Sequence, residues 1–193
     1  MDAFLAGEPQ LLPFEVDELG PLEGRLLHLQ SGSGLDSLDI ARLHPTVCVT
    51  GLDDAPHEVE AATQLASEVR LAHRARFVYA GLFHAIDVLE HQHFDVVYTG
   101  KGALHRVLDL DRWAGIVHDL VEPGGFLYCT EFHPVTSPQQ PPVGAVISAV
   151  LRAGLTLELF HEWIERPVGT WRPVDRGSVP VRYSLKAVRD IGR

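Results

Sequence analysis

Short apolar segments alternate with amphipathic helices along this chain, and the alternation constrains the fold more than any other feature. Apolar runs typical of buried strands are followed by segments whose apolar residues recur every three or four positions. Buried strands are therefore expected at 25–29, 46–54, 75–80, 94–99, 125–132, 155–163 and 180–188. Helices are expected at 35–43, from Pro56, from Asp111 and from 143 to Gly154.

The order of these elements predicts how they are layered. Strands that alternate with helices form a mostly parallel sheet with helices on both faces. The last two strands have no helix between them, so we expect an antiparallel pair at one edge. The residues EPGG at 122–125 are expected to form a turn that leads into the fifth strand. With 193 residues, the chain fits one α/β domain with one core.

The charge of the chain argues against several classes of partner. Acidic residues outnumber basic ones by 26 to 16, giving a net charge of -10, so nucleic acids and anionic membranes are not expected to bind. The first twenty residues contain no Lys or Arg, so a signal peptide is not expected. No apolar run approaches 18 residues, so no membrane-spanning helix is expected. Cys48 and Cys129 lie in apolar segments and are expected to be free core thiols, which suits the reducing cytoplasm.

A glycine-containing turn and a downstream carboxylate suggest a nucleoside site. QSGSG follows the first predicted strand, and glycine there lets the backbone approach a ligand closely. Asp53 lies 19 residues after Gly34, at the end of the second strand, where a carboxylate can accept hydrogen bonds from both ribose hydroxyls. The alternative is an ordinary turn with a helix-capping Asp. The turn lacks the GxGxxG spacing, which disfavours a nicotinamide-dependent oxidoreductase.

Several motifs occur in a fixed order around this pair. LLHLQSGSGLDSL is followed by VTGLD, RFVYAG, FDVVYTGKGAL, LDLDRWAGIVHDLVEPGGFLY and TEFHPV. In this order the motifs resemble the class I S-adenosylmethionine-dependent methyltransferases, especially a bacterial subgroup that has HLQ where others have DLG. The resemblance covers residues 22–135 and resumes over 143–188.

The resemblance implies a fold and a domain plan. The fold is a Rossmann-like three-layer sandwich whose mostly parallel, seven-stranded sheet has one antiparallel strand near the edge. The whole chain, 1–193, would be a single methyltransferase-like domain. Residues 1–21 would be an N-terminal extension, and the Pro-rich loop 135–142 would replace a longer lid.

The resemblance also implies roles for residues at the carboxyl ends of the strands. The segment from Gln30 to Gly34 would hold the methionine portion of S-adenosylmethionine, and Asp53 would hold its ribose. The family's usual acid for the adenine amino group is absent here. The implied cofactor-binding residues are Gln30, Ser31, Gly32, Gly34, Asp53, Asp54, Gly81, Leu82, Thr99 and Gly100, with Lys101 also beside the methyl group.

The implied reaction displaces a methyl group from a sulfonium, for which the protein must align a nucleophile and exclude water. A general base is needed only for a protonated amine or a hydroxyl. His105 and His133 follow the fourth and fifth strands and are the candidate catalytic residues, because histidine takes up a proton near neutral pH. Each could instead be a polar residue of the rim. Glu131 either orients His133 or contacts the neighbouring loop.

Two other groups of residues are candidate functional sites. His91 and His93 form an HxH pair, but a zinc site needs further spaced ligands, so no metal is expected. Trp163 and Trp171 flank a loop rich in Pro and Arg. They either line the acceptor site or cover the edge of the sheet, and the sequence favours neither.

The methyl acceptor, small molecule or larger, is not identified by the sequence. Relatives carry longer segments before the first motif and after the fifth strand, and these segments close over the acceptor. Only about twenty residues precede Leu22, so the lid is expected to be largely missing. A large acceptor or the second copy in a homodimer would then supply the cover. The alternative is a catalytically degenerate domain that binds S-adenosylmethionine or S-adenosylhomocysteine, or acts through protein contacts. A catalyst should keep an open cavity near Thr99, His105 and His133, which a degenerate domain would fill.

Overall fold

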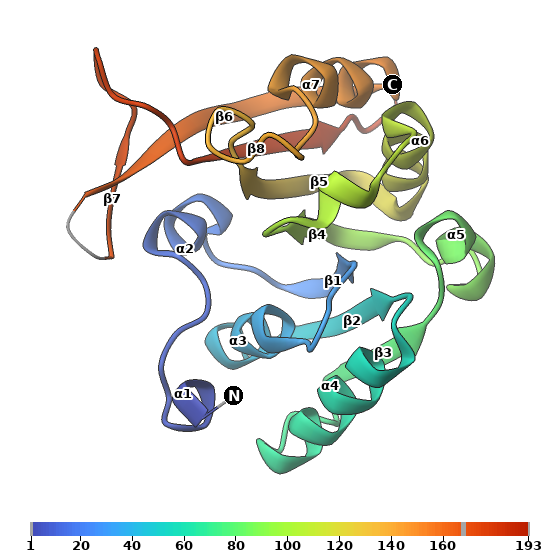
Figure 1. Ribbon diagram of the computed structural model, residues 1–193. Helices are drawn as coiled ribbons and strands as arrows, with labels where there is room; N and C mark the ends of the chain where they lie inside the picture. The colour runs from blue at the N-terminus through green and yellow to red at the C-terminus, as the bar shows by residue number, and fades with distance from the viewer. Residues whose placement is uncertain (1, 167–168, 193) are drawn as a thin grey trace.

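The computed structural model describes residues 2–166 and 169–192, and its centre is one mixed sheet of eight strands (Figure 1). Across the sheet the strand order is β3-β2-β1-β4-β5-β8-β6-β7. The strands are β1 Gly24–Leu29, β2 Val47–Asp53, β3 Ala75–Tyr79, β4 Phe94–Gly100, β5 Val121–Phe132, β6 Leu155–Arg166, β7 Thr170–Pro173 and β8 Arg182–Arg189.

Strand direction confirms the Rossmann-like α/β fold. Strands β1 to β5 run parallel, β8 pairs antiparallel with β5, and β6 pairs antiparallel with β8. The eighth strand, β7, was not predicted: its four residues pair with the end of β6 from Trp163 to Arg166. This segment, TWRP, is too short and too polar to show the alternation by which strands are recognised.

The predicted turn at 122–125 is instead part of β5. The pairing between β4 and β5 shifts register between Phe94 and Val96, and Gly124 adopts a φ of 88°. An irregularity of this kind accommodates extra residues without ending the strand. The glycines of the EPGG segment therefore lie in an irregularity within β5 and not in a turn before it.

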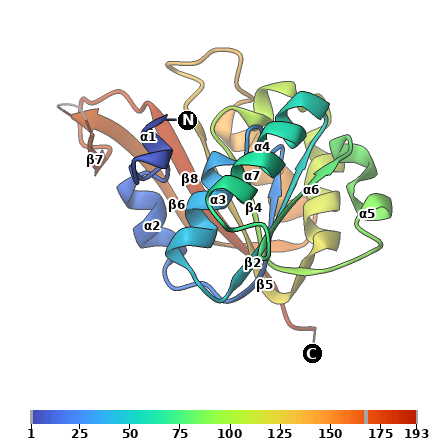
Figure 2. The ribbon, with the colours of Figure 1, turned by 90° about the horizontal axis from the view of Figure 1, so that it is seen from below.

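Helices cover both faces of the sheet, as Figure 2 shows for α2 and α3 on one side and α5 and α6 on the other. Neighbouring residues of β1 belong to different cores, since Leu26 packs in one cluster and Leu27 in the other. The helices are α1 Asp2–Leu5, α2 Pro13–Leu19, α3 Leu35–Leu43, α4 Pro56–Glu68, α5 Ala85–Val88, α6 Leu110–Leu120 and α7 Val143–Arg152, with short 3-10 turns η1 Leu82–His84 and η2 Ala103–Arg106.

The N-terminal extension packs on the sheet as two short helices. Phe4, Leu11 and Leu19 belong to the core that also contains Leu26 of β1. Glu15 in α2 is completely buried, and its carboxylate accepts hydrogen bonds from the Tyr98 hydroxyl at 2.7 Å and the Leu12 amide at 2.7 Å. Because these contacts join the extension to β1 and β4, the extension is an integral part of the fold.

The two cysteines differ in exposure. Both are free, and Cys129 is buried as expected. Cys48 was predicted to be a core thiol, but it is exposed near the start of β2, where its side chain reaches the surface. Over 2–166 and 169–192, no helix is both long enough and apolar enough to cross a membrane.

Candidate active site

Two cavities meet at the carboxyl ends of β1 and β4. The strand order reverses between these strands, and ligands of open α/β sheets bind in the crevice outside such a point. The first cavity, of about 410 Å³, and the second, of about 490 Å³, share the lining residues Gln30, Gly32, Gly100 and Lys101. The first is also lined by Gln10, Leu12, His28, Ser31, Ser33, Leu35, Asp36 and Arg182. The second is also lined by Asp53, Ala55, His57, Glu58, Gly102, Ala103, His105 and Arg106.

The turn after β1 uses its two glycines differently. Both have positive φ, 51° at Gly32 and 74° at Gly34. A Cβ added at Gly34 would lie 2.6 Å from the Phe77 ring and 2.8 Å from the Ala62 Cβ, so Gly34 permits close packing of α3. A Cβ added at Gly32 would meet no atom within 4 Å. The space beside Gly32 belongs to the cavities.

Asp53 lies directly against this turn, as the sequence predicted. Its carboxylate accepts a hydrogen bond from the Gly32 amide at 2.8 Å and another from the Ala55 amide at 2.9 Å. Asp53 is only 2% exposed, yet it lines the second cavity. Each carboxylate oxygen has a second acceptor position, so Asp53 can hold the turn and still accept hydrogen bonds from a ligand.

Five of the predicted cofactor residues, Gly34 among them, line neither cavity. Asp54 is exposed and forms an ion pair with Arg106 at 3.6 Å. Gly81 precedes η1, and Leu82 packs against the core beneath it. Thr99 is completely buried within β4. By contrast, Gln30, Ser31, Gly32 and Gly100 line the first cavity, and all but Ser31 also line the second.

Glu131 holds the loop after β4. Its carboxylate accepts hydrogen bonds from the Gly102 amide at 2.7 Å and the Leu104 amide at 2.9 Å. Burial raises the pKa of Glu131, which the two amides oppose. Of the two roles considered for this residue, the structure supports contact with the loop, which carries Lys101 and His105 to the cavities.

The two candidate histidines occupy different environments. His105 is exposed and lines the second cavity, and its Nδ1 contacts the Gly102 carbonyl oxygen. His133 is buried and lines neither cavity. Its Nδ1 accepts a hydrogen bond from the Val135 amide at 3.2 Å, and its Nε2 lies 2.9 Å from Glu162. Both ring nitrogens of His133 are therefore engaged by residues that lie outside the cavities.

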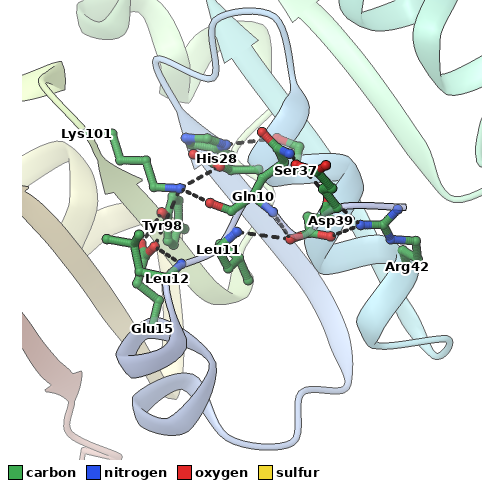
Figure 3. Close-up of polar contacts among 12 residues, drawn as sticks. Gln10, Leu11, Leu12, Glu15, His28, Ser37, Asp39, Arg42, Tyr98 and Lys101 are labelled. Atoms are coloured by element: carbon green, nitrogen blue, oxygen red, sulfur yellow. Dashed lines mark hydrogen bonds and ion pairs between the residues drawn. The ribbon is translucent and has the colours of Figure 1, made fainter. Parts of the chain in front are cut away.

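The N-terminal extension contributes to the wall of the first cavity. Gln10 and Leu12 line this cavity. Figure 3 shows the contacts of Gln10 with Lys101 and Asp39. The Lys101 ammonium donates to the Gln10 carbonyl at 2.8 Å and to Asp36 at 2.6 Å, and it lies 3.5 Å from Glu15. The Asp39 carboxylate accepts hydrogen bonds from the amides of Gln10 and Leu11 at 2.6 and 3.0 Å. Contacts across 65 or more residues, such as that between Lys101 and Asp36, leave no local sequence signal.

A family model described as a methyltransferase domain matches residues 23–158. The chain belongs to the methyltransferase domain family. It is therefore an S-adenosylmethionine-dependent methyltransferase, and this agrees with the open crevice beside Gly32 and Asp53. A comparison with curated proteins finds no match.

Solved structures of methyltransferases share the fold. A TehB-like S-adenosylmethionine-dependent methyltransferase from Corynebacterium glutamicum superposes with a TM-score of 0.73, at 16% identity over 98% of this chain and 93% of that chain. Geranyl diphosphate C-methyltransferase from Streptomyces coelicolor A3(2), in complex with S-adenosylhomocysteine, gives a TM-score of 0.71 at 11% identity, covering 91% of this chain and 74% of that chain. At these identities the likeness establishes the fold alone.

The turn after β1 carries polar atoms without hydrogen-bond partners in the methyltransferase. The side-chain oxygens of Gln30 and Ser31 are buried and have no hydrogen-bond partner among the described residues. Both residues line the first cavity, so a ligand there would lie beside unpaired polar groups. Together with the open space beside Gly32, they form a polar cradle next to Asp53.

His28 lies at the base of the first cavity in the methyltransferase. It is 3% exposed, and its Nδ1 lies 2.8 Å from the Ser37 hydroxyl. Burial, with a smaller contribution from the charge of Lys101, lowers the pKa of His28 to about 3. His28 is therefore neutral at physiological pH and offers the cavity a polar but uncharged wall.

Trp163 and Trp171, whose roles the sequence did not decide, lie in different environments. Trp163 stacks on Phe14 of α2 with ring centroids 4.4 Å apart and donates to the Ser184 hydroxyl at 2.8 Å, so it covers the sheet. Trp171 lies under the guanidinium of Arg182, which lines the first cavity. Sequence reasoning missed Arg182. An isolated arginine at the start of a predicted strand carries no signal that it faces a cavity.

Among the described residues, no group of three or more His, Cys, Asp and Glu side chains could hold a metal ion. Of the HxH pair, His93 lies 3.4 Å from Glu122.

Proposed function

We propose that this methyltransferase is catalytically active and transfers a methyl group to a small-molecule acceptor enclosed in part by its own N-terminal extension. The observation that carries this proposal is the open crevice on both sides of Gly32. Both cavities lie within the size range of small-molecule sites, about 300–1,000 Å³. A degenerate domain is the alternative, and an open, polar crevice is not what loss of function would preserve.

We propose that the cofactor spans the two cavities. Gln30, Ser31 and Gly32 would hold its methionine portion, and Asp53 would accept the ribose hydroxyls, leaving the adenine in the second cavity. The shared position of Gly100 and Lys101 supports a methyl group at the boundary. Gly34, Asp54, Gly81, Leu82 and Thr99 have no direct role in this proposal, because none of them lines a cavity.

The residues of the chain divide the catalytic work. The cofactor supplies an activated methyl group on a sulfonium, so the protein mainly orients the acceptor and excludes water. Gln10 and Leu12 exclude water from the first cavity, held there by Asp39 and Lys101. Of the two candidate bases only His105 lines a cavity, the second one, and it would approach the acceptor hydroxyl or amine across the boundary at Gly100 and Lys101, where the methyl group would lie.

We place the chain in the subgroup with HLQ in the first motif, because His28 and Gln30 of that motif both line the first cavity. We treat 1–193 as one domain, supported by one sheet whose strands run from Gly24 to Arg189. The free thiols of Cys48 and Cys129 suit a cytoplasmic location.

Calorimetric titration with S-adenosylmethionine and S-adenosylhomocysteine tests the proposal. Wild type should bind both, and Asp53→Ala should bind each at least tenfold more weakly, because hydrogen bonds to a charged group contribute about 1.5–3 kcal/mol. Asp54→Ala is the matched control: it removes the neighbouring carboxylate, which lies outside both cavities, and should bind like wild type. Absence of heat with wild type, or equal losses in the two variants, would refute the site.

A further inference from the structure

Arg182 lies at the edge of the sheet where the cavities open. It begins β8, opposite Phe132 at the end of β5, and its side chain lines the first cavity. The order β1-β4-β5-β8 places its strand three spacings from β1, about 14 Å at the usual separation of strands. Arg182 therefore reaches the first cavity from the side opposite the turn that holds Gln30 and Gly32.

Aromatic rings, rather than carboxylates, hold the Arg182 guanidinium. Its central carbon lies 4.1 Å from the centroid of the Phe132 ring and 5.8 Å from that of Trp171. Among the described residues, its buried Nη1 has no hydrogen-bond acceptor, and no carboxylate forms an ion pair with the guanidinium. The rings fix the plane of the guanidinium without using its N–H groups.

The nearby carboxylates direct their hydrogen bonds elsewhere. Asp36, in the same cavity, accepts from the Lys101 ammonium at 2.6 Å. Glu131 accepts from the Gly102 and Leu104 amides, and Glu15 from the Tyr98 hydroxyl and the Leu12 amide. Lys101 thus has carboxylate partners within the fold. Among the described residues Arg182 has none within ion-pair distance, although its charge opposes the rise in the pKa of Asp36 and of Glu131. A buried guanidinium nitrogen without an acceptor is unfavourable until a ligand supplies one.

We propose that Arg182 binds the carboxylate of the methyl acceptor, so that the enzyme methylates small carboxylic acids at another position of the molecule. This inference rests on the proposed function. A guanidinium presents paired N–H groups that match a carboxylate with two parallel hydrogen bonds, and Arg182 lines the cavity while Phe132 and Trp171 contact its guanidinium through their rings. The position of Arg182 across the cavity from the turn after β1 assigns it to the acceptor rather than to the cofactor.

The test compares acids with their isosteric amides on the protein saturated with S-adenosylhomocysteine. Benzoate and benzamide form one pair of probes, and propionate and propionamide form the other. Calorimetry should show that wild type binds at least one acid about tenfold or more tightly than its amide, as expected for a charge-assisted bidentate contact. Arg182→Met should lose that preference, and Arg182→Lys should recover part of it because lysine keeps the charge but not the fork.

Lys186→Met is the matched control. Lys186 lies on the same strand, and its ammonium is 4.3 Å from the centroid of the Phe126 ring of β5, but it lines neither cavity. This variant should keep the acid preference, and all variants should bind S-adenosylhomocysteine like wild type. Weaker binding of S-adenosylhomocysteine by Arg182→Met would overturn the proposal by assigning Arg182 to the cofactor's own carboxylate. Equal or absent binding of acids and amides by wild type would also overturn it. Failure of wild type to bind S-adenosylhomocysteine would instead refute the proposed function.

Discussion

Replacing Gly32 or Gly34 with alanine tests two separate roles of the turn after β1: close packing of α3 at Gly34 and open space for a ligand at Gly32. At Gly34 the φ of 74° is unfavourable for alanine by about 1–2 kcal/mol. The new Cβ would also lie 2.8 Å from the Ala62 Cβ, and such overpacking costs about 1–3 kcal/mol. Together these effects should destabilise Gly34→Ala by about 2–5 kcal/mol.

At Gly32 only the backbone effect applies. The φ of 51° costs an alanine about 1 kcal/mol, and its Cβ would meet no protein atom within 4 Å. That Cβ would instead occupy the space proposed for the methionine portion of the cofactor. Gly32→Ala should therefore fold almost normally and bind S-adenosylhomocysteine poorly.

Thermal unfolding and calorimetry distinguish the two variants. For a chain of this size each kcal/mol lowers the Tm by about 2–4 °C, so Gly34→Ala should unfold about 4–20 °C below wild type and Gly32→Ala only a few degrees below. The affinity of Gly32→Ala for S-adenosylhomocysteine should fall by about tenfold or more. Equal losses of stability, or normal binding by Gly32→Ala, would refute this account of the turn.

Two further predictions concern titratable groups. Burial raises the pKa of Glu15 above its usual 4.5, so its contribution to stability is complete below pH 4.5 and is lost as the pH rises through the folded-state pKa. In urea unfolding from about pH 4 to about pH 8, the free energy of unfolding of wild type relative to Glu15→Gln should therefore decrease as the pH rises, and a constant difference would contradict this.

With an acceptor that must lose a proton, His105→Asn should slow methyl transfer, measured as formation of S-adenosylhomocysteine, by about 100-fold or more. His133→Asn should lower the Tm but leave the rate of methyl transfer within a few-fold of wild type. Similar rates for the two histidine variants would show that neither is the base.

Local patterns in the sequence were sufficient to predict most of the architecture. The alternation of apolar runs with helices on a 3.6-residue repeat depends only on residues close together in the chain, and it predicted β1 to β6 and β8. Parallel strands end at the same edge of a sheet, which is why Gly32 and Asp53 could be expected to meet, and they do so at 2.8 Å. The bulge at Gly124 and the short β7 were missed, because both depend on pairing with a distant partner.

Only the tertiary structure decided which side chains face the cavities. His105 and His133 follow neighbouring strands in similar fashion, yet His105 lines a cavity while His133 is held by Val135 and Glu162. The part of the first cavity's wall that the N-terminal extension contributes depends on contacts between residues far apart in sequence, such as Gln10 with Asp39. Sequence periodicity specifies elements and their buried faces. The direction of one side chain at the end of a strand depends on what packs beside it, and that is determined when the whole sheet is assembled.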